Sequence, residues 1–215
     1  MFFLAFFVNS PHFMISYEIF YKSFSKKIGF NKYSLVGLII PIVLFLLISF
    51  GIFYDSKKIF TLLLLSMFFL VGWHYIKQSY GCFIVYSAGN KIFYNKTEQS
   101  LIKYSLYPLW IGSFLNIFAN NKFNNYWGLE YNFSGILNEH TLFIKILSIS
   151  GVLIFLSVII NHYFKKKQLP NLIALTPILI GYIWLSPIFW NDIYFYMIPF
   201  FHSLQYFLFS GSYTY

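Results

Sequence analysis

Long apolar runs separated by short polar segments dominate the pattern of this chain. Most runs reach roughly 16 to 20 residues or more, the length a helix needs to cross about 30 Å of hydrocarbon at about 1.5 Å per residue. The sequence therefore predicts an all-α, polytopic transmembrane helical bundle of about seven spans, forming a single integral membrane domain over residues 1–215. The predicted spans cover residues 2–21, 34–54, 59–88, 101–119, 141–160, 171–189 and 193–209.

Two of these runs leave the number of spans between six and eight. The run 59–88 has thirty residues, which is too many for one perpendicular crossing. It is either one long tilted helix or a span to Ile76 followed by an interfacial extension. The run 101–119 is short, contains Pro108 and follows a polar stretch at 89–103; membrane helices tolerate such a proline.

The lysines are distributed unevenly between alternate loops. Four follow the first span, four lie between the third and fourth, and three follow the fifth, whereas the intervening loops carry two, one and none. Because basic residues concentrate in cytoplasmic loops, the N-terminus is predicted on the non-cytoplasmic side and the C-terminus in the cytoplasm. Lys77 belongs to this count only if the third span ends near Ile76.

Composition supports the same class of protein. Hydrophobic residues make up 59% of the chain and charged residues 10%, which is more apolar than a water-facing surface tolerates, so the lipid bilayer is the expected partner. The formal net charge is +9, but arginine is absent and no basic helix occurs, so no nucleic-acid partner is expected.

The bias toward residues with A/T-rich codons indicates a bacterial inner membrane, with an organelle inner membrane as the alternative. Cys82 is the only cysteine, and we expect it to be a small apolar filler.

Three polar clusters interrupt the apolar spans, each around one histidine: His12, His74 or His202. Polar side chains in hydrocarbon cost a few kcal/mol, so those that are present are candidates for function. If the third span is the long helix, the three histidines lie near the middle of their spans. Neutral imidazole is a good ligand for iron, copper or zinc. The sequence predicts a three-histidine metal site, with iron as the expected metal.

Further polar residues accompany these histidines at helical spacing. Lys77 and Gln78 share a helix face with His74, and Gln205 follows His202 by three residues. We assign Lys77, Gln78 and Gln205 to catalysis, as groups that orient a histidine, a bound water or the substrate. The alternative for each histidine is a hydrogen bond to a neighbouring helix, which contributes roughly 0.6 kcal/mol on average.

Other polar residues have simpler predicted roles. Glu18 and Lys22 are spaced to pair at i,i+4. His140 and His162 lie at opposite ends of the fifth span, where we expect them to contact water. No acidic residue lies deep in a clear span, which disfavours a carboxylate-bridged di-iron site or an ion-coupled carrier. No phosphate-binding loop and no HExxH or GxSxG motif occurs, so the common NTPase, zincin and hydrolase classes lack support.

Three patches carry a resemblance to known families. They are Pro11-His12-Phe13 with Ser16-Tyr17, His74-Tyr75 with Lys77-Gln78 and Tyr80-Gly81, and His202-Ser203-Leu204-Gln205-Tyr206. They resemble patches of uncharacterised bacterial polytopic membrane proteins with histidine motifs. The chain is also remotely similar to bacterial β-carotene-cleaving membrane dioxygenases, which are all-helical and hold one iron with histidines from several helices. It differs from that family in lacking a Pro-His-Gly patch and in having three central histidines where the family uses four.

Three functions are compatible with this pattern. The first is a metal-dependent membrane oxygenase that acts on an apolar, lipid-soluble small molecule. The second is a non-catalytic subunit of a larger respiratory or transport complex in the membrane. The third is a transporter or a quinone- or haem-binding protein, because these also use membrane histidines.

Overall fold

The computed structural model describes residues 14–15, 17–18, 20–22, 34–119, 125–126, 129–130, 141–186 and 197–204, with the backbone alone at 116–119, 125–126, 129–130 and 141. The chain divides into two compact units: one formed by residues 61–190, and one by 1–60 with 191–215. We describe each unit by itself. The regular structure in the described residues is helical apart from two-residue antiparallel strands, Asn125–Tyr126 (β1) and Leu129–Glu130 (β2). The all-α prediction is confirmed.

The unit that contains the N-terminal part of the chain holds one apolar helix of membrane length. A short π-helical turn, η1 (Leu35–Ile39), continues into α3 (Ile40–Phe53). Together they confirm a helix at the position of the span predicted at 34–54, and this helix is long and apolar enough to cross a membrane. Apolar side chains surround this helix on all sides, and only its glycines at 37 and 51 are buried. A helix that is apolar all round is typical of a membrane span.

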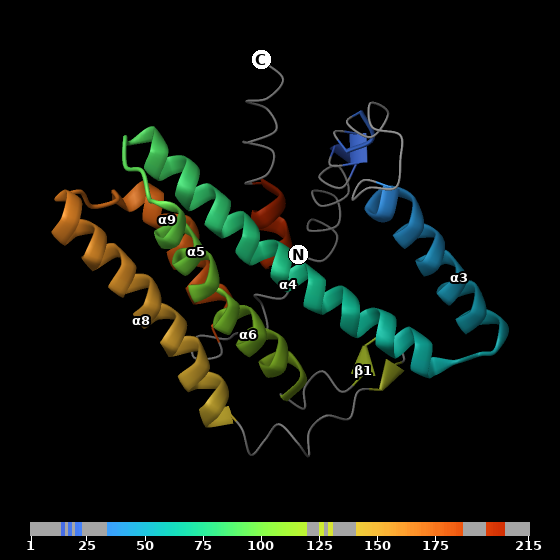
Figure 1. Ribbon diagram of the computed structural model, residues 1–215. Coiled ribbons are helices and arrows are strands. Elements are labelled where there is room, and N and C mark those ends of the chain that lie inside the picture. The colour runs from blue at the N-terminus through green and yellow to red at the C-terminus, as the bar shows by residue number, and fades with distance from the viewer. Residues whose placement is uncertain are drawn as a thin grey trace. The chain divides into compact units, whose positions relative to one another are not determined.

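Helix α4 (Lys57–Gly89) is continuous over 33 residues (Figure 1). Its length is about 50 Å at 1.5 Å per residue, so it corresponds to the long helix among the two alternatives for the run at 59–88. Lys77 consequently lies inside a helix and not in a loop. The lysines between the third and fourth predicted spans number three rather than four.

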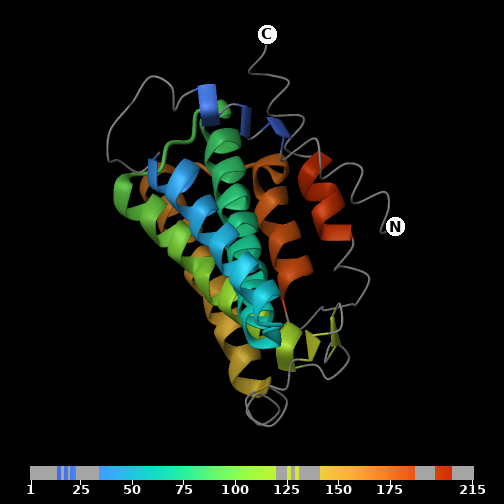
Figure 2. The same ribbon diagram turned by 90° about the vertical axis from the view of Figure 1, so that its right-hand side faces the viewer.

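Within the described residues, four helices build the rest of the unit 61–190 with the larger part of α4. The polar stretch predicted before the fourth span folds into an amphipathic helix, α5 (Lys96–Ser105), which α6 (Tyr107–Ala119) follows directly. Helix α8 (Thr141–Lys166) comes next, and α9 (Leu172–Leu185) is shorter. Helices α5 and α6 together run antiparallel along α8 in both views (Figure 1, Figure 2).

Small residues allow this antiparallel pair to approach closely. A Cβ on Gly112 would lie 2.7 Å from the Ser148 hydroxyl, and one on Gly151 would overlap the Ser105 carbonyl oxygen. The helix breaks after Ser105, just before Pro108, because proline has no N–H to continue the helical hydrogen bonds. The Tyr182 hydroxyl of α9 donates to the Ser105 carbonyl oxygen at 3.2 Å. A backbone acceptor at the break is therefore hydrogen-bonded by α9, and α8 packs closely against the same point.

Helix α4 packs on this core through specific contacts. The Trp110 indole of α6 donates to the Phe69 carbonyl oxygen of α4 at 2.8 Å. Further along α4, Phe83 is fully buried, with its ring centroid 5.4 Å from that of Tyr94 and 5.5 Å from that of Phe155. Cys82 is buried beside it, as the sequence predicts.

The described residues contain three helices that are long and apolar enough to cross a membrane: Leu35–Phe53, Lys57–Gly89 and Leu142–Lys166. These three helices do not by themselves support a bundle of seven spans. The run predicted at 101–119 is divided at Leu106, and the run at 171–189 gives only the 14-residue α9 with Pro177 inside it. The first span and the seventh fall largely outside the described residues.

Candidate functional site

The predicted three-histidine site is only partly covered by the structure. His12 and Gln205 lie outside the described residues. His74 belongs to the unit 61–190, whereas His202 is buried in the helical segment 197–204 of the other unit. Within the described part of the chain, no group of three or more His, Cys, Asp or Glu side chains could hold a metal ion. The three-histidine site, which joins residues of both units with residues outside the described ranges, stays a prediction.

The polar face of α4 lies as the helical spacing predicts. His74 is exposed near the middle of the helix, and Lys77 and Gln78 are half-buried one turn later. The Lys77 ammonium lies 5.3 Å from the centre of the Trp73 ring, a cation–π distance. A Cβ on Gly81, which shares this face, would meet nothing within 4 Å. The face is open at that point.

A different polar site lies in the same unit, where α5 begins. Asn95 is the N-cap of α5, and its side chain accepts a hydrogen bond from the Glu98 backbone N–H at 2.8 Å. The Glu98 carboxylate in turn accepts the Asn95 backbone N–H at 2.9 Å. This reciprocal capping box satisfies two backbone donors that the first turn of a helix leaves free.

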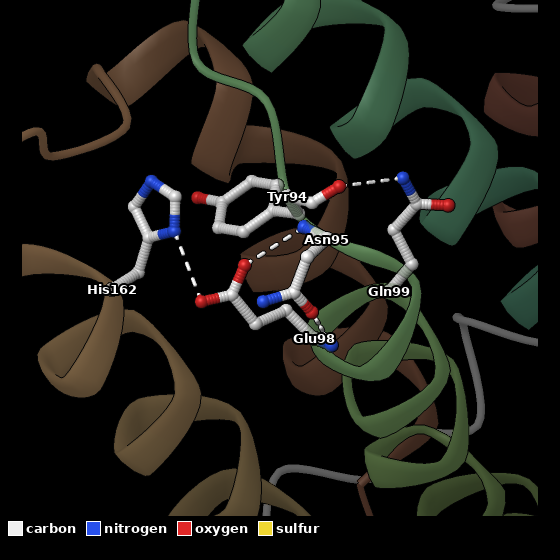
Figure 3. A network of polar contacts seen from close by, with 5 residues as sticks. All are labelled: Tyr94, Asn95, Glu98, Gln99 and His162. Atoms are coloured by element: carbon white, nitrogen blue, oxygen red, sulfur yellow. Dashed lines mark hydrogen bonds and ion pairs between the residues drawn. The ribbon is translucent and has the colours of Figure 1, made fainter. Parts of the chain in front are cut away.

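The second oxygen of the same carboxylate faces α8. His162 Nδ1 lies 3.2 Å from Glu98 Oε1, and both side chains are almost completely buried (Figure 3). An ionised carboxylate only accepts hydrogen bonds, so Nδ1 of the imidazole carries the hydrogen in this pair. The pair joins the first turn of α5 to the last turns of α8.

Tyr94 completes the site from the segment before α5. Its ring centroid lies 4.6 Å from that of His162, and its hydroxyl points toward the imidazole (Figure 3). Burial raises the pKa of this phenol to about 12; the nearby Ser87 hydroxyl opposes the rise, and the negative charge of Glu98 adds to it. Tyr94 is therefore a neutral hydroxyl at physiological pH.

Three buried polar atoms of the site have no hydrogen-bond partner among the described residues: Ser87 Oγ, Tyr94 OH and His162 Nε2. The two hydroxyls are near neighbours but do not meet in hydrogen-bond geometry. A carboxylate on Nδ1 leaves Nε2 available as a base or as one metal ligand. Because the described residues place no group of three or more His, Cys, Asp or Glu side chains here, the chemistry that the geometry supports is a buried, charge-assisted contact between helices.

This site was not predicted from the sequence. His162 was expected to contact water at the end of a span, but its side chain is 1% exposed, so that expectation is wrong. The predictive pattern was Asn95-Lys96-Thr97-Glu98, which has the spacing of a capping box and predicts a helix start inside the polar stretch. The predicted pair of Glu18 with Lys22 is confirmed, at 2.6 Å.

These features define the class of the protein as a helical protein whose described residues include three candidate membrane-spanning helices. No protein-family model, curated protein or solved structure gives a significant match to the chain.

Proposed function

We propose that the chain is a multi-pass integral membrane protein of about seven crossings, with its N-terminus outside and its C-terminus in the cytoplasm. Helices α5 and α6 together support one crossing beyond the three long helices, because they follow α8 along its length. The lysines that follow α4 and α8 lie at one end of the unit 61–190, where the two helices terminate. This distribution supports a cytoplasmic location for that end.

The topology predicts opposite labelling of two exposed positions. In a Cys82→Ala background, Lys57→Cys at the start of α4 should react with a membrane-impermeant maleimide in intact cells. Gln168→Cys, just after α8, should react only after the cells are permeabilised. Both side chains are exposed, so a difference in labelling reports the side of the membrane. Equal labelling in intact cells would contradict the topology.

We further propose that the protein is a metal-dependent oxidoreductase, with iron as the metal and an apolar, lipid-soluble small molecule as the substrate. His12, His74 and His202 are the proposed ligands, and the observation that carries the proposal is the exposed polar face at His74. A histidine, a lysine and a glutamine in the middle of an apolar helix are costly unless they have a function. Lys77 and Gln78 would contact the substrate or the ligands, as would Gln205.

Elemental analysis of the purified protein tests this proposal. The unmodified protein should contain close to one iron, copper or zinc per chain, and His74→Ala should lose it because a metal ligand is removed. His140→Ala, a histidine outside the proposed set, is the matched control and should keep the metal. The metal contents of the two variants are compared only for preparations that are equally monodisperse. Absence of metal from the folded unmodified protein would overturn the proposal.

The second candidate is a non-catalytic subunit of a larger membrane complex. Its support is the helix formed by η1 and α3, whose apolar side chains are mostly exposed, a surface that lipid or neighbouring subunits can cover. Native mass spectrometry of gently solubilised protein distinguishes the two functions. Stable partner subunits together with an absence of metal favour the complex, whereas a metal-loaded single chain favours the enzyme.

A further inference from the structure

Lysines from three segments of the unit 61–190 gather at one end of it. Two contacts bring these segments together: the pair of Glu98 with His162, and the Asn171 side-chain amide, which donates to the Asn90 side-chain oxygen at 3.1 Å. The lysines adjoin these contacts and are exposed. We call them the lysine end; they are Lys91, Lys96, Lys165, Lys166 and Lys167.

Among the described residues, no exposed acidic side chain accompanies the lysine end. Glu98 is the acidic residue that the structure describes here, and it is turned inward, 6% exposed. Its two oxygens are occupied by the Asn95 backbone and by His162. An uncompensated group of five lysines at a protein surface attracts anions.

Exposed apolar side chains alternate with the lysines. Phe93 is 69% exposed, Phe164 67% and Leu169 57%. All three lie within three residues of a lysine of the lysine end. Free phosphate offers such side chains no contact, whereas the headgroup region of a bilayer accommodates aromatic rings, apolar groups and lysines together.

Two of the lysines occupy a backbone conformation that favours glycine. Lys91 follows α4 with φ of 61°, and Lys167 follows α8 with φ of 56°. This left-handed conformation is unfavourable for L-residues by roughly 1–2 kcal/mol, and glycine is the usual residue at such helix ends. The Lys167 ammonium lies over the Tyr163 ring, 5.3 Å from its centre. Glycine would therefore be more favourable for the backbone at both positions, whereas lysine places a positive charge there.

We propose that the lysine end binds the phosphate headgroups of anionic phospholipids in the leaflet that it faces. Lysines supply the charge, and Phe93, Phe164 and Leu169 enter the region between headgroups and acyl chains. The two strained lysines hold charge at the ends of α4 and α8, where glycine would be more favourable for the fold. The proposal rests on the membrane location and is independent of the metal site.

The test compares thermal unfolding of the full-length protein in detergent with added phosphatidylglycerol, phosphatidylcholine or inorganic phosphate. Phosphatidylglycerol should raise the unfolding temperature, and the other two additions should not. Each lysine near an anionic surface contributes about fivefold in affinity, so replacing Lys165, Lys166 and Lys167 with glutamine should weaken the apparent affinity on the order of 100-fold. Lys145→Gln, an exposed lysine in the first turns of α8, is the control and should bind normally.

Lys167→Gly separates lipid binding from stability. Without lipid this variant should unfold at a higher temperature than the unmodified protein, because glycine relieves the strained backbone. It should nevertheless bind phosphatidylglycerol about fivefold more weakly. Equal stabilisation by phosphatidylcholine, full stabilisation by phosphate alone, or unchanged affinity of the triple variant would each overturn the proposal. None of these outcomes depends on whether the protein contains metal.

Discussion

Replacing Gly151 with alanine should destabilise the unit 61–190 by about 2–4 kcal/mol, the sum of overpacking and a lost buried hydrogen bond. The added Cβ would overlap the Ser105 carbonyl oxygen and approach the Tyr182 hydroxyl to 3.4 Å. The backbone at Ser105 cannot move away without also disturbing the hydrogen bond that it accepts from Tyr182. The effect is measured by thermal unfolding in detergent, with the loss of monodisperse protein as the readout.

Gly81→Ala is the matched control for this substitution. It is also a helical glycine, in α4, but a Cβ there would meet nothing within 4 Å. Alanine is the better helix former by about 1 kcal/mol. This variant should therefore unfold at the same temperature as the unmodified protein or at a slightly higher one. If Gly151→Ala unfolded at the same temperature as Gly81→Ala, this result would contradict the close packing of α8 against the break between α5 and α6.

Replacing His162 with alanine should cost about 3 kcal/mol or more, because it leaves the Glu98 carboxylate buried without its charge-assisted partner. It also opens space beside the Tyr94 ring, which lies 4.6 Å from the imidazole, centre to centre. Asn161→Ala changes the exposed neighbouring residue on α8 and should alter stability by less than about 0.5 kcal/mol. Unfolding temperatures of the two variants give the comparison.

A double-mutant cycle isolates the contact between α5 and α8. Glu98→Gln keeps the capping box, because glutamine also fits this motif, and removes the negative charge that faces the imidazole. The combined variant Glu98→Gln with His162→Ala should lose less stability than the two single variants added together, by about 1 kcal/mol or more. Strict additivity would show that the carboxylate and the imidazole do not interact.

The parts of the fold that follow from local composition were predictable. The helices at 34–54 and 141–160 were expected because an apolar run of that length has few alternatives in a bilayer. The continuity of α4 was one of two alternatives, because Lys77 and Gln78 resemble the end of a span when only the sequence is considered. Helix α5 was missed because its polar composition masked a capping box at Asn95.

The parts that depend on contacts distant in sequence were not predictable. His162 looked like a residue at the edge of a span because its neighbours on α8 are lysines and asparagine. Its burial depends on Glu98, which is 64 residues away, and on Tyr94 folding over it. The three-histidine site likewise depends on how different helices face one another, which helical spacing within a single span does not determine.

The position of Glu98 has a consequence for how the protein enters the membrane. Its capping box is formed by Asn95, three residues away, so the first turn of α5 can form as soon as it is synthesised. His162 follows 64 residues later. If α5 and α6 form the proposed crossing, the carboxylate lies at its start and does not have to traverse the bilayer, so it can stay hydrated until α8 is synthesised. In the proposed topology, α6 and α8 are the apolar segments of this hairpin that enter the bilayer, and the buried contact between Glu98 and His162 forms last, when α8 packs against α5.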